Sequence, residues 1–293
     1  MRLMSPVSNV LTITWLTFHE ARRRRVVLAA LVLGLLFIIL YVIGFIFIVN
    51  QAAVATSGAG LESGAAEAGY QLGLNFLTMA GLYVVHFLSI MLAIFASVDT
   101  ISGEIASHTI QAIATKPVRR WEIVIGKWLG QSLMIMPYLV GLCAGIVLSI
   151  RVITGYMPDN IVQIVALILL QALVLLSLSL LGGTKLSTLT NGVVLFMLYG
   201  LAFIGSWIEQ IGSLLGSDAA VNIGIVTSLL MPVEALWRMA AGLLSPGLLT
   251  VDKRLSLLFG AASVPSSLMV AYAVAYAGVV LGLAVRTFSR RDL

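Results

Sequence analysis

The sequence predicts an all-α polytopic membrane protein with about six transmembrane helices. Hydrophobic residues make up 60% of the 293 residues and charged residues only 10%, whereas soluble domains are about half apolar and about a quarter charged. The apolar residues also form long uninterrupted runs instead of amphipathic stripes, as expected for helices that face lipid. We therefore expect a single transmembrane domain that covers residues 1–293.

Six apolar runs are long enough to cross a hydrocarbon core of about 30 Å at about 1.5 Å per residue. They cover approximately residues 26–49, 75–98, 129–150, 161–181, 192–211 and 265–285. The first run resembles a secretory signal, because Ala53-Val54-Ala55 follows it. It is nevertheless too long and too far from the terminus for a signal that is removed, so we expect it to remain in the membrane.

The segment before the first run combines an apolar face with a basic cluster. Leu11, Trp15 and Phe18 recur at helical spacing on one face. The basic cluster consists of Arg22, Arg23, Arg24 and Arg25. This combination is typical of a helix in the headgroup region beside an anionic leaflet. We expect an N-terminal interfacial helix anchored by Trp15 and the four arginines.

Basic residues are distributed unequally between the two sides of the predicted domain. All but four of the 17 Lys and Arg residues fall on the side of the N-terminus, and the four exceptions are Arg151, Arg238, Lys253 and Arg254. Because loops rich in Lys and Arg stay in the cytoplasm, we expect both termini there and an even number of spans. Basic residues at the ends of apolar runs also argue against a nucleic-acid-binding patch.

Residues 213–264, between the fifth and sixth spans, are expected to form extracytoplasmic helices. Within them, residues 226–244 are apolar enough for a seventh span but contain Pro232, Glu234 and Arg238. A seventh span would also place the basic C-terminus outside the cell. We expect instead a helix that lies at, or dips into, the outer interface.

No catalytic or metal-binding motif is recognisable in the sequence. The three histidines, His19, His86 and His108, are scattered, and the chain contains neither HExxH nor GxSxG. The single cysteine, Cys143, excludes an internal disulfide and a cysteine-based metal cluster. The chain also lacks the Gly-x4-Gly-Lys-Ser/Thr loop that binds ATP phosphates. We expect a protein that is not an enzyme, so any ATP hydrolysis must occur in a separate subunit.

His86 is the one ionisable residue near the middle of a predicted span. Ionisable residues inside a membrane mark functional positions by default. A neutral imidazole that is hydrogen-bonded to a neighbouring helix is the alternative, and both interpretations remain open.

The charged segment over residues 100–127 is expected to lie in water on the cytoplasmic side. If residues 101–115 are helical, isoleucines and alanines occupy one half of the helix surface. The other half carries Glu104, Ser107, His108, Gln111 and Thr115. Thr100 or Ser102 can cap the start of this helix, and Pro117 ends it.

Runs within this segment resemble the signature of ABC-2 type permeases, the membrane subunits of a class of bacterial ABC exporters. The matching runs are Gly103-Glu104-Ile105, Thr109-Ile110-Gln111, Lys116-Pro117-Val118-Arg119-Arg120 and Gly126-Lys127. The family pattern is an acidic residue, a Gly-Thr-Leu-like triplet, a Lys-Pro-Val-x-Arg turn and a Gly-Lys pair that opens the third span. The chain departs from this pattern at His108, where the family usually has glycine.

The resemblance implies a plasma-membrane protein of bacteria with six spans. It also implies a transmembrane dimer, formed with an identical or a different permease chain, and a cytoplasmic ATPase dimer that carries ATP and Mg. A groove of that ATPase would receive the helix over residues 104–115. The outer helices within residues 213–264 would cover the translocation path.

We therefore expect a permease subunit, more specifically of an exporter, that has no cofactor of its own and embeds in the lipid bilayer. The residues expected to couple it to the ATPase are Glu104, Ser107, His108, Gln111, Lys116, Arg119 and Arg120. A helix that merely rests on the bilayer, with Lys116, Arg119 and Arg120 as anchors, is the alternative for this segment. A membrane scaffold without an ATPase and an ion-coupled carrier are the alternatives for the whole chain.

Overall fold

The structure, a computed structural model, describes residues 6–58, 63–107, 118–158, 160–244 and 263–291. Within these ranges the chain is helical and contains no strand. In the described part of the chain, six helices are long and apolar enough to span a membrane. They are α2 (Arg25–Gly58), α3 (Ser63–Ser97), α6 (Arg120–Thr154), α7 (Ile161–Gly183), α8 (Thr188–Leu215) and α13 (Leu268–Ser289). The prediction of an all-α polytopic membrane protein is confirmed.

Several of these helices extend beyond the apolar runs that predict them. The clearest example is α6, which begins at Arg120, whereas the third apolar run begins at about residue 129. The first turns of α6 carry Glu122 and Lys127, which we expect in water from the sequence, and both are buried. That expectation is wrong because each charge has a partner on a neighbouring helix, so a hydropathy boundary does not mark the end of the helix.

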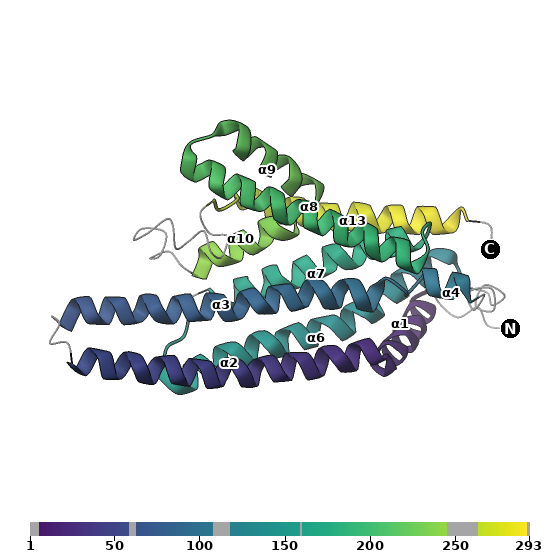
Figure 1. The fold of residues 1–293 in the computed structure, drawn as a ribbon. Helices are drawn as coiled ribbons and strands as arrows, with labels where there is room; N and C mark the ends of the chain where they lie inside the picture. The colour runs from purple at the N-terminus through teal and green to yellow at the C-terminus, as the bar shows by residue number, and fades with distance from the viewer. Residues whose placement is uncertain (1–5, 59–62, 108–117, 159, 245–262, 292–293) are drawn as a thin grey trace.

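Helices α3 and α7 form the centre of the bundle (Figure 1). Helix α7 contacts α3, α6, α8, α10 and α13, and side chains such as Leu82 on α3 and Ile168 on α7 are fully buried. Helix α2 lies at the outside and exposes a row of large apolar side chains, among them Leu28, Leu35 and Phe47. Such a row is the surface that a helix presents to lipid.

The N-terminal helix α1 (Pro6–Arg23) packs across the start of α6. Two glycines of α6 allow this close approach, because a Cβ atom at Gly126 would lie 2.7 Å from Ile13 and one at Gly130 would lie 2.7 Å from Thr17. The opposite face of α1 exposes large apolar side chains, including Leu11 and Trp15. The predicted interfacial helix therefore has one face on the protein and one face available to lipid.

The first and last described residues lie at the same end of the bundle (Figure 1). The C-terminal part is held there, because Arg120 at the start of α6 donates hydrogen bonds to the carbonyls of Ser289 and Arg291. Arg291 in turn donates to the carbonyl of Thr184 after α7. We call this end, which carries Arg22–Arg25, Lys127, Lys185, Arg286, Arg290 and Arg291, the basic end.

The apolar stretch over residues 226–244 does not form one helix. Helix α9 (Asp218–Leu230) ends before Met231 and Pro232, and α10 (Val233–Leu244) leaves at an angle of 110°. Proline favours such a break, because it has no N–H to donate and a fixed φ that suits the start of the next helix. Helix α9 folds back along α8, and α10 enters the bundle between α7 and α8 (Figure 1).

Contact between α8 and α9 depends on two facing glycines. A Cβ atom at Gly205 would overlap Thr227, and one at Gly224 would overlap the Cβ of Glu209 and lie 2.8 Å from the carbonyl oxygen of Gly205. These neighbours are backbone atoms or the first atoms of side chains, so rotamer changes cannot make room for the extra carbon.

We therefore predict opposite effects for two Gly→Ala substitutions. Gly224→Ala should push α9 away from α8 and destabilise the protein by about 1–3 kcal/mol. Gly200→Ala, on the same α8, meets nothing within 4 Å, and it should be neutral or stabilise by up to about 1 kcal/mol because alanine favours the helix. Thermal unfolding of the detergent-purified variants measures both changes. Equal midpoints would contradict close α8–α9 packing.

Candidate functional site

The short helix α4 (Ser102–Ala106) follows α3 at the basic end. Neither Thr100 nor Ser102 caps it, because the N-cap residue is Ile101 and no side chain bonds the first turn. The Ser102 hydroxyl instead hydrogen-bonds to the hydroxyl of Thr188 on α8 over 2.8 Å. The Thr100 hydroxyl accepts from Gln131 Nε2 on α6 over 2.9 Å. Thr100 and Ser102, expected from the sequence to cap the helix, thus connect this segment to the spanning helices α6 and α8.

Glu104 on α4 forms an ion pair with Lys127 on α6. The side chains are 13% and 3% exposed, so the pair is largely shielded from water. A largely buried pair interacts more strongly than a surface pair, and removing one partner leaves an unpaired buried charge. Glu104, expected to face the ATPase, therefore holds α4 against α6.

Asp99, at the end of α3, joins two further elements of the basic end. Its carboxylate lies 3.5 Å from Arg24 Nη1 and accepts a hydrogen bond of 3.1 Å from the Thr188 hydroxyl. Arg24 also pairs with Glu20 over 2.6 Å. The other three arginines of the predicted anchor, Arg22, Arg23 and Arg25, are exposed. Of the four, Arg24 is thus the one with ion-pair partners in the described part of the chain.

Arg119 and Arg120, both expected to contact the ATPase, have different surroundings. Arg119 is the N-cap residue of α6, and its backbone N–H donates to Glu122 Oε2 over 3.1 Å, while its side chain is exposed. Asn9 on α1 donates to the same oxygen over 3.0 Å. The side chain of Arg120 instead donates to the carbonyls of Ser289 and Arg291. Of the two, Arg119 has the side chain that a partner can reach.

The remaining predicted coupling residues are only partly within the described chain. Ser107, directly after α4, is exposed. His108, Gln111 and Lys116 lie outside the described residues. The structure therefore brings Glu104 and Ser107 together on the α4 segment and gives no geometry for those three.

A buried polar cluster surrounds His86 in the middle of the bundle. His86 Nδ1 lies 2.6 Å from Gln171 Oε1 on α7, and Nε2 lies 3.3 Å from Glu234 Oε1 on α10. The Tyr199 hydroxyl of α8 also hydrogen-bonds to Glu234. The His86 ring stacks on that of Trp237 with 4.8 Å between ring centres. His86 is thus hydrogen-bonded to neighbouring helices, as one interpretation expects, but one of its partners is a carboxylate.

A second buried group joins α10 to α8. Arg238 pairs with Glu209 on α8 and donates to Ser228 Oγ on α9 over 2.9 Å. Ser263, before α13, donates to Glu209 over 2.9 Å. Arg238 is 1% exposed and Glu209 5%. The two groups together, His86–Gln171–Glu234–Tyr199 and Glu209–Arg238–Ser228–Ser263, are called the α10 network below.

Sequence reasoning missed this network. Glu234 and Arg238 are spaced by four residues, which favours contact along one helix. The two nevertheless have separate charged partners, because Glu234 faces His86 on α3 and Arg238 pairs with Glu209 on α8. The available signal was that Glu209, Glu234 and Arg238 all interrupt apolar sequence close to the membrane, where unpaired charges are costly.

The α10 network has the features of a mechanical connection between helices. Among the described residues, no group of three His, Cys, Asp or Glu side chains could hold a metal ion. Several buried polar atoms of the network, including Gln171 Nε2 and Arg238 Nε, have no protein partner within the described chain. Buried polar atoms of this kind are the usual partners of ordered water. The hydrogen bonds and the ion pair of the network can therefore hold α10 in place inside the bundle.

Breaking one side of this network should be more harmful than removing both sides. Arg238→Met leaves the Glu209 carboxylate buried and unpaired, which should cost about 3–5 kcal/mol. The double variant Glu209→Gln/Arg238→Met removes both charges and should recover a substantial part of that loss. Thermal unfolding midpoints of the two purified variants test this. If the double variant were less stable than Arg238→Met, the two residues would not act as a pair.

Comparison with known proteins supplies the family. A family model described as ABC-2 family transporter protein matches residues 11–293. No curated protein matches the chain. The matched region includes all six spanning helices, the α4 segment and the α10 network, so the resemblance found in residues 103–127 is confirmed over nearly the whole sequence. The chain belongs to the ABC-2 family of transporter proteins.

Proposed function

We propose that the chain is the permease subunit of an ATP-driven ABC exporter and that a separate ATPase dimer docks at the basic end. Membership of the ABC-2 family supports a membrane subunit that associates with an ATP-binding subunit. The sequence has no phosphate-binding loop of its own, so ATP and Mg would be held by the partner. A second permease chain, identical or different, would complete the transmembrane dimer.

The observation that carries this proposal is the attachment of α4 to two spans. Glu104 joins α4 to Lys127 of α6, and Ser102 joins it to Thr188 of α8. A displacement of α4 by a docked ATPase would therefore move the starts of both helices. In this proposal Ser107, His108, Gln111, Lys116 and Arg119 make the contact, whereas Glu104 transmits the movement.

Helix α8 would carry the movement across the membrane. It runs without a break from Thr188, near α4, to Glu209, which pairs with Arg238 of α10. These two positions are about 31 Å apart along the helix at about 1.5 Å per residue. ATP-dependent closure of the partner would favour one of two arrangements of α8 and α10 relative to α3 and α7.

The ion-coupled carrier is the second candidate, because such carriers have intramembrane charges and broken helices. The α10 network and the 110° break between α9 and α10 provide both features. Transport by the purified chain without an ATPase would support the carrier. Stable assembly of another complex without transport would support the scaffold.

The orientation of the basic end can be tested by cysteine labelling. We propose that this end faces the cytoplasm of a bacterial plasma membrane, as the asymmetry of Lys and Arg favours. In intact cells, Ser217→Cys should react with an impermeant thiol reagent, and Arg119→Cys should react only after permeabilisation. The native Cys143 is buried and should stay silent. Labelling of Arg119→Cys in intact cells would contradict the orientation.

The coupling role of Glu104 can be tested by charge reversal. Glu104→Arg places two cations side by side in a shielded site, which should cost several kcal/mol locally and release α4 from α6. We expect transport-stimulated ATP hydrolysis to fall at least about tenfold, since 1.4 kcal/mol already corresponds to tenfold. The swap Glu104→Lys/Lys127→Glu should restore part of it. Asp218→Arg, an exposed change at the other end, is the matched control.

Two outcomes would contradict this role. If Glu104→Arg behaved like Asp218→Arg in ATPase co-purification and in coupled hydrolysis, Glu104 would have no part in coupling. If no ATPase co-purified with the unmodified chain, the docking proposal itself would fail and the scaffold would gain support.

A further inference from the structure

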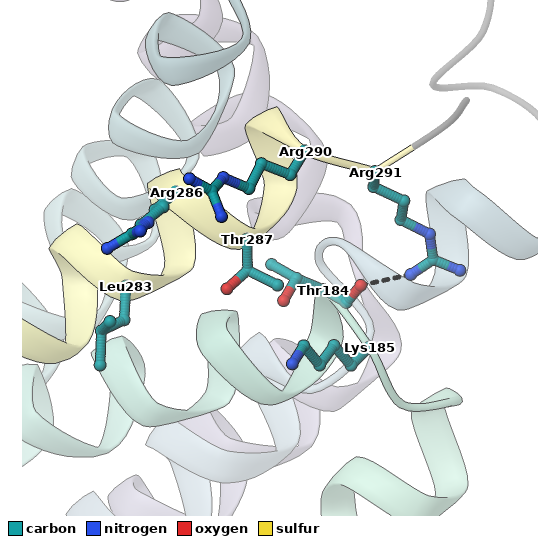
Figure 2. Close-up of a pocket in the computed structure, with 7 residues that line it drawn as sticks. All are labelled: Thr184, Lys185, Leu283, Arg286, Thr287, Arg290 and Arg291. Carbon is teal, nitrogen blue, oxygen red and sulfur yellow. Dashed lines mark hydrogen bonds between the residues drawn. The ribbon is translucent and has the colours of Figure 1, made fainter.

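A basic pocket lies between the last turns of α13 and the connection from α7 to α8. Its volume is about 720 Å³, and Figure 2 shows the residues that line it. They are Thr184, Lys185, Leu283, Arg286, Thr287, Arg290 and Arg291. Four of the seven are cationic and none is acidic. The coupling proposal makes no use of this pocket.

Three of these cations have no ion-pair partner among the described residues. Arg286 and Arg290 extend from α13, and Lys185 faces them from the α7–α8 connection, with Thr184 and Thr287 between them (Figure 2). All three basic side chains are exposed. Arg291 points to the other side and donates to the Thr184 carbonyl. Like charges around one cavity repel, so an anion within it would be stabilised.

The end of α13 explains only part of this arrangement. Basic side chains in the last turn of a helix interact favourably with its free carbonyl groups. That effect accounts for Arg286 and Arg290. It does not account for Lys185, which comes from a different element yet lines the same cavity. Convergence from two elements is the feature that indicates a binding site.

The length of α13 puts the pocket at the level expected for lipid headgroups. Helix α13 has 22 residues, which corresponds to about 33 Å and is enough to cross the hydrocarbon core. Arg286 and Arg290 stand at its end, and Leu283, one turn earlier, forms the apolar edge of the pocket. Anionic lipids attract basic residues at this level.

We propose that this pocket binds the phosphate group of an anionic phospholipid in the leaflet at the basic end. The guanidinium groups of Arg286 and Arg290 can each donate two hydrogen bonds to phosphate oxygens, and Lys185 adds a third cation. The acyl chains would leave along Leu283 and the exposed face of α13. A bound lipid would join α13 to the residues that lead into α8.

The experiment compares lipid binding by matched pairs of variants. The wild-type chain is purified in neutral detergent, and native mass spectrometry measures its affinity for phosphatidylglycerol and for phosphatidylcholine. Arg286→Gln/Arg290→Gln should weaken phosphatidylglycerol binding at least about tenfold, because each cation near a headgroup contributes on the order of 1 kcal/mol. Arg22→Gln/Arg23→Gln removes two exposed charges of the expected N-terminal anchor but leaves the pocket intact, so it reports general attraction to an anionic leaflet and should weaken binding much less than Arg286→Gln/Arg290→Gln. Phosphatidylcholine should bind more weakly to the wild-type chain.

A second measurement keeps the test independent of folding. Arg286→Lys/Arg290→Lys retains both charges but not the paired donors, so its affinity should fall between those of the wild type and the Gln pair. Nanodiscs of equimolar phosphatidylglycerol and phosphatidylcholine should raise the unfolding midpoint of the wild type above that in phosphatidylcholine alone. Arg286→Gln/Arg290→Gln should lose this difference but keep the wild-type unfolding midpoint in nanodiscs of phosphatidylcholine alone.

Four results would overturn the proposal. Equal weakening in both Gln pairs would indicate general surface charge. Equal affinity for both lipids would exclude headgroup recognition. Binding of inorganic phosphate with the same dependence on Arg286 and Arg290, without any effect of phosphatidylglycerol, would assign the pocket to a free anion. If Arg286→Gln/Arg290→Gln lost ATPase co-purification while lipid binding stayed unchanged, the pocket would be assigned to an acidic protein surface.

Discussion

The ion pair between Arg238 and Glu209 allows a charged helix to lie inside the bundle. Removing an ion from water costs several kcal/mol, which only an oppositely charged partner and additional hydrogen bonds can offset. Helix α10 carries two charged residues, Glu234 and Arg238, and both are almost fully buried. Its position therefore depends on partners from α3, α8 and α9. The sharp break before Val233 and the close contact between α8 and α9 serve this pairing, because together they bring Arg238 beside Glu209 and Ser228.

The same requirement shapes the basic end. Glu122 is buried, and it accepts hydrogen bonds from Asn9 and from the backbone of Arg119. Glu104 is shielded and has Lys127. Each of these acidic side chains connects two or more segments that are distant in sequence. The connection of α4 to α6 is thus a consequence of keeping these charges paired.

The sequence predicts the fold class and the approximate place of every span, because long apolar runs and the distribution of Lys and Arg are sufficient for that. It does not predict where α6 begins or what α10 contacts. A hydropathy boundary assumes that charges face water, whereas Lys127 and Arg238 are buried beside partners far away in sequence. Similarly, the sequence suggests that Glu104 is free to contact a partner protein. The fold shows that its carboxylate is already paired with Lys127.

Cations at the basic end fall into two classes with different consequences. Lys127, Arg24 and Arg120 have partners within the described chain, so each stabilises one arrangement of the helices and is less free to bind anything else. Lys185, Arg286 and Arg290 have no ion-pair partner there, so their charge adds repulsion to the folded state until an anion binds. A protein gains stability from a ligand that binds only the folded state. If both proposals hold, the unpaired class is where the surrounding membrane would influence this permease, and the paired class is where a docked ATPase would move it.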